Sequence, residues 1–255
     1  MASNWRKIVP PAIVLALIVI VWQLVVDGGA VERWELPSPT DIVHEAASIA
    51  PRLLDHTSAT LQLALIGFMI GAAAGIVLAA FLHLIPGARE AISPLLILSQ
   101  NIPIIVLAPL LVLWFGFGLT PKIVLVTLVC FFPVAVSMLT GLRERDARLA
   151  EYLRMLGAGR WRLFASLELP YSIPYVFSGL KIAATYSMTS AVVAEWVGAD
   201  RGLGYFMQLS RKGFMAPRVF AAVIIIVAIS LALYSVIVLI ERLMIRWRPK
   251  KEERA

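Results

Sequence analysis

Long apolar runs separated by short polar segments make up most of the chain. A helix needs about 20 apolar residues to cross the hydrocarbon core of a bilayer, and several runs approach that length. The pattern predicts an all-α polytopic membrane protein with an even number of spans, so both termini should share one side. The six predicted transmembrane helices cover roughly Ile8–Val26, Leu61–Leu82, Ala91–Trp114, Ile123–Leu139, Ile173–Ala194 and Val219–Ile240.

Composition agrees with a membrane location. Of the 255 residues, 60% are hydrophobic and 15% are charged, and the mean hydropathy of +0.85 is far above that of soluble domains. The net charge of +7 lies mainly between the apolar runs, where basic residues set membrane orientation. We therefore expect a lipid bilayer as a partner and no nucleic acid. The single cysteine, Cys130, lies in an apolar run, which excludes a disulfide framework and a thiolate metal site.

The distribution of Lys and Arg orients the chain. Arg6 and Lys7 precede the first run, but no small-residue cleavage site follows it, so we expect a retained helix rather than a signal peptide. With the N-terminus inside, fifteen basic residues lie in inner segments. This excess predicts cytoplasmic termini and a basic cytoplasmic tail at 243–255. Fewer basic residues lie in outer segments, among them Arg33, Arg52, Arg201, Arg211, Lys212 and Arg218.

Two local patterns describe the first part of the chain. Between Leu36 and Asp41, two prolines interrupt regular structure, and Ser38 or Thr40 can cap a following helix. A short outer surface helix is expected at about Asp41–Leu54. In the second run, glycines recur at a spacing of four, which allows close helix contact in lipid. We expect Gly67, Gly71 and Gly75 to pack against another helix of the same molecule. The alternative is that they form the contact between two copies in a dimer.

Polar residues inside two runs mark a candidate translocation pathway. The third run contains three prolines and a central Gln100-Asn101 pair, and the fifth contains hydroxyl residues and ends at a carboxylate. Polar groups are costly in hydrocarbon, so they should face protein or a water-filled cavity. The amides can equally cross-link neighbouring helices. Lys181 is expected to snorkel to the cytoplasmic surface. The candidate pathway residues are Gln100, Asn101, Thr185, Met188, Thr189 and Glu195.

Catalytic motifs do not appear in the sequence. His44, His56 and His83 are scattered, and there is no HExxH, GxSxG or GxxxxGK[ST] pattern. A conduit is therefore favoured over an enzyme, with no catalytic or metal-binding residues. A lipid-modifying membrane enzyme would need clustered carboxylates, whereas Glu144, Asp146, Glu151 and Glu168 alternate with arginines and resemble an ion-paired surface. An ion-coupled transporter should show an inverted repeat, and none is found.

The segment from Glu151 to Pro170 is amphipathic and too short to span a membrane. Asp146 can cap a helix ending near Leu156, and Gly157 can terminate it in the left-handed region. Apolar residues form a stripe on each side of the glycine. The segment is either an interfacial helix pair or a cytoplasmic knob for a soluble protein. The first stripe is Leu149, Leu153 and Leu156, and the second is Trp161, Phe164 and Leu167.

Glu151, Gly157 and Leu169-Pro170 resemble the cytoplasmic EAA loop of permease subunits of binding-protein-dependent ABC importers. The resemblance extends from about Trp22 to Glu241. Within this family, the chain looks most like the branch for nitrate, sulfonates, taurine and thiamine precursors. Tyr152 and Leu153 depart from the two small residues usual in this loop. The other matching phrases are Leu36-Pro37-Ser38-Pro39, Asn101-Ile102-Pro103, Leu113-Trp114-Phe115-Gly116, Leu156-Gly157-Ala158-Gly159-Arg160-Trp161, Val193-Ala194-Glu195 and Gly202-Leu203-Gly204-Tyr205.

The resemblance implies a type I ABC importer permease in the bacterial inner membrane. It implies that residues 1–255 form one permease domain. Residues 1–56 would hold the first transmembrane helix and the outer surface helix, and residues 57–242 would form the core. The partners implied are a second copy, two cytoplasmic ABC ATPase subunits that bind ATP and Mg, and an extracytoplasmic solute-binding protein. This chain would hold no cofactor. The implied ATPase-coupling residues, in a loop at 141–172, are Arg148, Glu151, Tyr152, Arg154, Met155, Gly157, Ala158 and Arg160.

The implied substrate is a small polar nutrient. The phrases Ser99-Gln100-Asn101-Ile102-Pro103 and Val129-Cys130-Phe131-Phe132-Pro133 resemble permeases for thiamine pyrimidine precursors or riboflavin more than those for sulfonates. A fixed positive charge for an anion is missing from the spans apart from Lys181, which favours a neutral or heteroaromatic solute. A sulfonate, taurine or nitrate permease is the alternative, and an integral membrane enzyme is a more distant one.

Overall fold

The computed structural model describes residues 2–85 and 87–245, apart from the side chains of 2–8, 89, 90, 93, 97, 99 and 100. All regular structure in these ranges is helical, as predicted. The elements are α1 (Ala2–Asp27), α2 (Pro39–Ser48), α3 (Ala50–Leu84), α4 (Ala88–Gln100), α5 (Ile104–Phe115), α6 (Leu119–Arg143), α7 (Ala147–Met155), α8 (Arg160–Leu163), the π-helical turn η1 (Phe164–Glu168), α9 (Leu169–Glu195), α10 (Leu203–Lys212) and α11 (Ala216–Met244).

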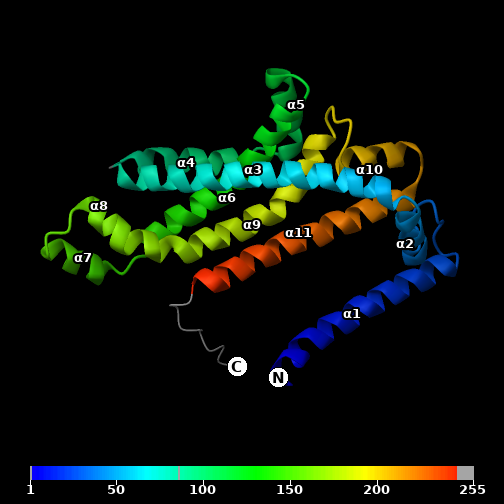
Figure 1. The fold of residues 1–255 in the computed structure, drawn as a ribbon, viewed down its shortest axis with the longest axis horizontal. Helices are drawn as coiled ribbons and strands as arrows, with labels where there is room; N and C mark the ends of the chain where they lie inside the picture. Colours follow the sequence, from blue (N-terminus) through cyan, green and yellow to red (C-terminus); the bar gives the residue numbers. More distant parts are fainter. Residues whose placement is uncertain (1, 86, 246–255) are drawn as a thin grey trace.

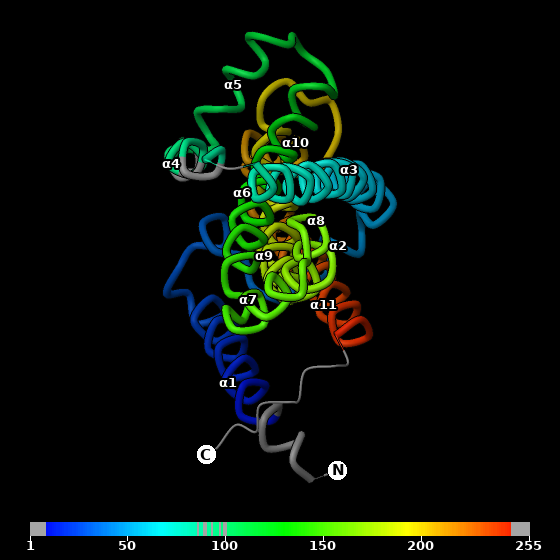
Figure 2. Tube along the Cα trace, turned by 90° about the vertical axis from the view of Figure 1, so that its left-hand side faces the viewer, coloured from blue at the N-terminus to red at the C-terminus, as the bar shows by residue number. Residues whose placement is uncertain are grey.

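A central bundle of α3, α6 and α9 organises the fold, and α11 packs along α9 (Figure 1). The short helices α7 and α8 lie at one end of the bundle, which we call the loop end. At the opposite end, the cap end, lie α2 and α10. Seen from the loop end, α4 lies beside α3, and α1 stands apart from α11 (Figure 2).

Five helices of the described chain are long and apolar enough to cross a membrane. The predicted count of six spans is wrong, because the third run, Ala91–Trp114, is divided between α4 and α5 by a break at residues 101–103. Pro103 starts α5 from an extended conformation, with ψ of 127°. At 12 residues, α5 is about 18 Å long, which is less than the hydrocarbon thickness of about 30 Å. The five spans are Val9–Asp27, Ala50–Leu84, Leu119–Arg143, Arg160–Glu195 and Ala216–Met244.

The predicted cap before the outer surface helix is present, but the helix is shorter than expected. The Asp41 N–H donates to the Ser38 hydroxyl at 3.1 Å, and the Ser38 N–H donates to the Asp41 carboxylate at 3.4 Å, which forms a capping box. The helix ends at Ser48, and α3 begins two residues later with a proline in its first turn. Leu54 therefore belongs to the long helix α3 and not to a surface helix.

The glycines of α3 bring its backbone against α6, which confirms packing within the molecule. A Cβ on Gly71 would lie 2.5 Å from the carbonyl oxygen of Thr127, and one on Gly75 would lie 2.8 Å from that of Phe131. Gly179 of α9 has the same role, because its Cβ would lie 2.7 Å from the carbonyl oxygen of Pro133. Lipid supplies no hydrophobic force between helices, so such close contact is a main source of cohesion.

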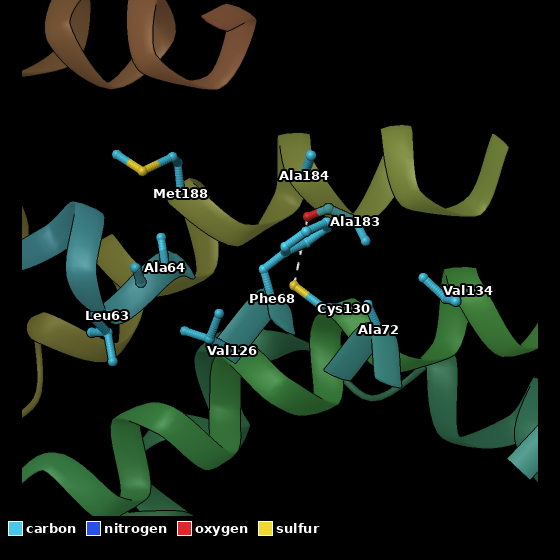
Figure 3. Close-up of a cluster of buried hydrophobic side chains, with 11 residues drawn as sticks. Leu63, Ala64, Phe68, Ala72, Val126, Cys130, Val134, Ala183, Ala184 and Met188 are labelled. Atoms are coloured by element: carbon cyan, nitrogen blue, oxygen red, sulfur yellow. Dashed lines mark hydrogen bonds between the residues drawn. The ribbon is translucent and has the colours of Figure 1, made fainter. Parts of the chain in front are cut away.

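Small and branched side chains fill the contact between α3, α6 and α9 (Figure 3). Cys130 is completely buried at its centre, and its thiol donates to the carbonyl oxygen of Ala183 at 3.5 Å. Val126 and Val134 are equally buried on the same helix. The thiol is therefore a core group that joins α6 to α9.

Replacing Gly71 by Val should destabilise the bundle, because the added side chain meets backbone atoms of α6 that cannot move aside. Overpacking of this kind costs about 1–3 kcal/mol. Thermal unfolding in detergent should show a lower Tm for Gly71→Val. Ala73→Val is the matched control, because Ala73 is exposed on the same helix. Equal melting temperatures for the two variants would contradict the packing account.

Candidate functional site

At the cap end, two side chains from the bundle cap the N-terminus of α10. The hydroxyl of Thr60 accepts a hydrogen bond from the Leu203 N–H at 2.7 Å and donates to Oε1 of Glu195 at 2.8 Å. The other carboxylate oxygen of Glu195 accepts from the Gly204 N–H at 2.7 Å. A helix N-terminus favours a negative group, because its first N–H groups lack partners within the helix. Thr60 and Glu195 therefore join α3, α9 and α10.

The glycines at this helix start are required by the close approach of Glu195. Gly202 has φ of +111° and donates its N–H to Nδ1 of His56 at 3.1 Å. A Cβ on Gly202 would lie 2.2 Å from the Glu195 carboxyl group, and one on Gly204 would lie 2.3 Å from the Val192 carbonyl oxygen. The phrase Gly202-Leu203-Gly204 is thus a helix start fitted around a buried carboxylate.

Two predicted pathway residues are not on an open surface. Met188 is completely buried among the core side chains in Figure 3, and its place in the pathway stays a prediction. Glu195 is 3% exposed, and both of its oxygens are bonded where it caps α10. Its place in the pathway stays a prediction. It lies in the wall of a cavity of about 560 Å³ at the cap end, together with Lys122 and Arg201.

The hydroxyl residues predicted for the pathway lie on one exposed face of α9. Thr185 and Thr189 are exposed, and so are Ser178 and Tyr186 on the same face. A cavity of about 350 Å³ is lined by Thr185, Tyr186 and Tyr234, among others. The face is mixed, because Ile182 is exposed beside these hydroxyls, and the helix is long and apolar enough to span a membrane.

Lys181 also borders this cavity, but its charge is paired. Its Nζ lies 2.9 Å from Oε2 of Glu241 on α11, and both side chains are about one-fifth exposed. Glu241 lies in the last turn of α11, and the snorkelling of Lys181 stays a prediction. The exposed face of α9 therefore carries Lys181 as one half of an ion pair and not as a lone cation.

The break between α4 and α5 lies beside the same face of α9. A second cavity of about 350 Å³ is lined by Ile102, Phe132 and Tyr186, so Tyr186 borders both cavities. Asn101 is exposed at the break, and its N–H donates to the Leu98 carbonyl oxygen at 3.1 Å. The side chain of Gln100 lies outside the described residues. The structure thus brings the broken helix and the hydroxyl face together.

The loop-end segment has the caps that its sequence predicted. The Asp146 carboxylate accepts from the N–H groups of Arg148 and Leu149 at 2.8 and 3.4 Å. Gly157 has φ of +79°, and the Ala158 N–H donates to the Leu153 carbonyl oxygen at 2.9 Å. This arrangement is a Schellman motif, in which glycine avoids the Cβ strain of the left-handed region. Two short helices are thus joined at a fixed turn.

Several large apolar side chains of this segment face outward. Met155 is 75% exposed, Leu156 is 66% exposed and Trp161 is 68% exposed. Leu149 and Leu156 of the first stripe and Trp161 of the second are exposed, whereas Phe164 of the second stripe and Ala150 of α7 are buried. Exposed apolar residues grouped on a short helix indicate a surface for a partner. The predicted coupling residues Arg148, Glu151, Tyr152, Arg154, Gly157 and Arg160 are exposed as well, and Ala158 is half-buried.

Two residues at the loop end were missed by sequence reasoning. Glu168 was expected on an ion-paired surface, but it is 4% exposed and paired with His83. The two residues are 85 positions apart, so no local pattern could connect them. Among the described residues, His, Cys, Asp and Glu do not gather in threes that could hold a metal ion.

These features define a polytopic membrane transport protein, with long spans, a broken helix beside a hydroxyl face, and an exposed helix pair at one end. Residues 67–246 match the model of a family described as binding-protein-dependent transport system inner membrane component. The chain belongs to this family. It is a permease component of an ABC importer, and its relatives place it with the sulfonate and taurine branch.

Curated relatives carry several substrate names. The formylaminopyrimidine transport permease of Halalkalibacterium halodurans is 32% identical over 94% of this chain and 96% of its own length. The riboflavin transport permease of Chloroflexus aurantiacus is 34% identical over 92% of this chain and 88% of its own length. A putative aliphatic sulfonates transport permease of Bacillus subtilis is 29% identical over 98% of this chain and 90% of its own length.

A solved structure shares the fold. A crystal structure of an amino acid ABC transporter with histidines superposes with a TM-score of 0.64 at 18% identity, covering 78% of this chain and 96% of that chain. At this identity the likeness supports the architecture alone.

Replacing Thr60 by Val should loosen the cap end. The change removes the acceptor of the Leu203 N–H and the donor to Glu195 while keeping the shape of the side chain. Unsatisfied buried polar groups cost about 1–3 kcal/mol each, so Tm in detergent should fall. Thr57→Val is the control, because the Thr57 hydroxyl donates to the Leu53 carbonyl of its own helix. A fall in Tm no larger than that of the control would contradict the capping account.

Proposed function

We propose that this chain forms the translocation pathway of an ATP-driven importer as a homodimer, with an ATPase subunit bound to the α7–α8 segment of each copy. ATP and Mg bind to the ATPase, and this chain has no catalytic role. A solute-binding protein docks at the cap end, which is extracytoplasmic, and both termini are cytoplasmic. The outward-facing apolar side chains of the α7–α8 segment are the observation that carries the proposal.

The α7–α8 segment has the properties of a docking lever. Tyr152 and Met155 present apolar area to solvent on a helix whose ends are both capped. Exposed arginines, including Arg148 and Arg154, surround this area and suit acidic groups on a partner. A short capped helix transmits displacement because it does not bend. Tyr152, which replaces a smaller residue of the usual loop, adds to the docking area.

The hydroxyl face of α9 supports a pathway. Thr185, Thr189 and Tyr186 are exposed on a helix long and apolar enough to span a membrane, and the break between α4 and α5 lies beside Tyr186. Polar side chains and broken helices are costly against lipid and are tolerated where they line a cavity or face protein. A second copy of the chain would enclose this face and keep it from lipid.

A small neutral heteroaromatic solute, of the kind represented by a thiamine pyrimidine precursor or riboflavin, is the proposed substrate. Lys181 is paired with Glu241, so the face offers no unpaired cation to an anion among the residues that line its cavity. Tyr186 and Tyr234 supply ring faces and hydroxyls for a flat polar solute. Two of the relatives are named for such solutes. A sulfonate is the alternative, and the relative from Bacillus subtilis favours it.

The cap end offers a surface for the solute-binding protein. Phe214 is 81% exposed there, with φ of +55°, although non-glycine residues rarely adopt positive φ. Trp34 is 59% exposed in the link between α1 and α2. Exposed aromatic side chains are frequent anchors of protein interfaces.

Replacing Met155 by Asp should weaken binding of the ATPase subunit, because it places a charge in the centre of the exposed apolar area. The ATPase encoded beside this chain should co-purify with the wild-type protein and be largely lost from Met155→Asp. Phe214→Asp is the matched control, since it removes an equally exposed apolar side chain at the opposite end. Unchanged co-purification of the Met155 variant would contradict docking at α7–α8.

Removing the hydroxyls of Thr185 and Thr189 together, by substitution with Val, should lower uptake without loss of assembly. One lost hydrogen bond of about 1 kcal/mol corresponds to roughly 5-fold in rate. Uptake into vesicles should be measured in parallel with a labelled formylaminopyrimidine, riboflavin and taurine. Thr140→Val, an exposed position at the loop end of α6, is the control. Normal uptake by the double variant would remove this face from the pathway.

A further inference from the structure

One buried carboxylate connects the three segments that meet at the loop end. Glu168 is the last residue of η1 and lies just before α9, and it is 4% exposed. Its Oε2 lies 2.6 Å from Nε2 of His83, near the end of α3. Its Oε1 lies 2.5 Å from Nη1 of Arg145, in the link between α6 and α7. Both oxygens therefore have a partner from a different part of the bundle.

A further contact ties the start of α8 to the same point. Nη2 of Arg160, the first residue of α8, donates to the backbone carbonyl oxygen of His83 at 3.0 Å. The His83 ring also lies against Phe164, with ring centroids 6.1 Å apart. The end of α3 is thus held by both sides of the α8–η1 segment.

The backbone at this point is a π-helical turn, Phe164–Glu168, between α8 and α9. Turns of this type are rare and often mark functional positions within a helix. Here the turn joins the α7–α8 segment to the helix that carries the hydroxyl face. Movement of α8 reaches α9 along the chain through this turn, and it reaches α3 through the contact of Arg160 with His83.

We propose that Glu168 is a positioning residue that couples movement of the α7–α8 segment to α3, α6 and α9. This inference rests on the proposed function, because it assumes that an ATPase moves that segment. Separating Glu168 from His83 and Arg145 would leave a buried charge without its partners, which is strongly unfavourable. The segments consequently move as one body when the ATPase displaces α8. Glu168 does not touch the solute or the ATPase in this account.

Glu168→Gln tests the coupling role, because it keeps the shape of the side chain and removes its charge. The full transporter, with its ATPase and its solute-binding protein, should be reconstituted in vesicles. We expect assembly and basal ATP hydrolysis to persist, while solute uptake per ATP hydrolysed falls roughly 5-fold or more, within the usual range of coupling between sites. Glu144→Gln is the matched control, because Glu144 is an exposed carboxylate in the neighbouring link.

Arg145→Gln provides a second variant if Glu168→Gln does not assemble, because it leaves the pair with His83 in place. It should also lower uptake per ATP. If the ratio of solute uptake to ATP hydrolysis is unchanged in whichever variant assembles, the inference is overturned. It is also overturned if a fall in uptake is fully explained by a smaller amount of assembled transporter. Absence of ATP-driven uptake in the wild-type complex would instead contradict the proposed function itself.

Discussion

Close contact between the backbones of α3, α6 and α9 is the constraint on which the structure depends. Glycines at Gly71, Gly75 and Gly179 allow this contact, and a Cβ at any of them would collide with backbone carbonyl groups of α6. Lipid contributes no hydrophobic force between helices, so shape and hydrogen bonding must hold them together. A rigid unit results, and the short helices at both of its ends take their positions from it.

Both ends of α9 carry a buried glutamate that binds other segments to this unit. Glu195 holds the N-terminus of α10 through Thr60 and a backbone N–H at the cap end. Glu168 holds the ends of α3 and α6 through His83 and Arg145 at the loop end. A buried carboxylate is tolerable only when its oxygens are bonded, so each one fixes the relative positions of its partners. A single helix thereby connects the surface proposed for the ATPase with the surface proposed for the binding protein.

Local features were predictable from the sequence, and long-range ones were not. The Asp146 cap, the left-handed Gly157 and the capping box at Ser38 depend on neighbours within a few positions, so their residue types were sufficient. The third run was counted as a full span because hydropathy reports only the length of an apolar run, although its three prolines pointed to a broken helix. The apolar stripe of α7 left two interpretations open, a helix on the membrane surface and a surface for a soluble partner, since periodicity cannot tell what covers an apolar face. Thr60 and Glu195 are 135 positions apart, and only the fold reveals their contact.

The most direct test of the account is the distance between the loop ends of two copies in the assembled transporter. A spin label can be placed at Arg162, an exposed residue of α8, because the one native cysteine, Cys130, is buried and will not react. Pulsed electron resonance should be recorded on the complex without nucleotide and with ATP trapped on the ATPase. The account predicts that the distance shifts to a new, equally narrow distribution when ATP binds. An identical distribution in both states would contradict it.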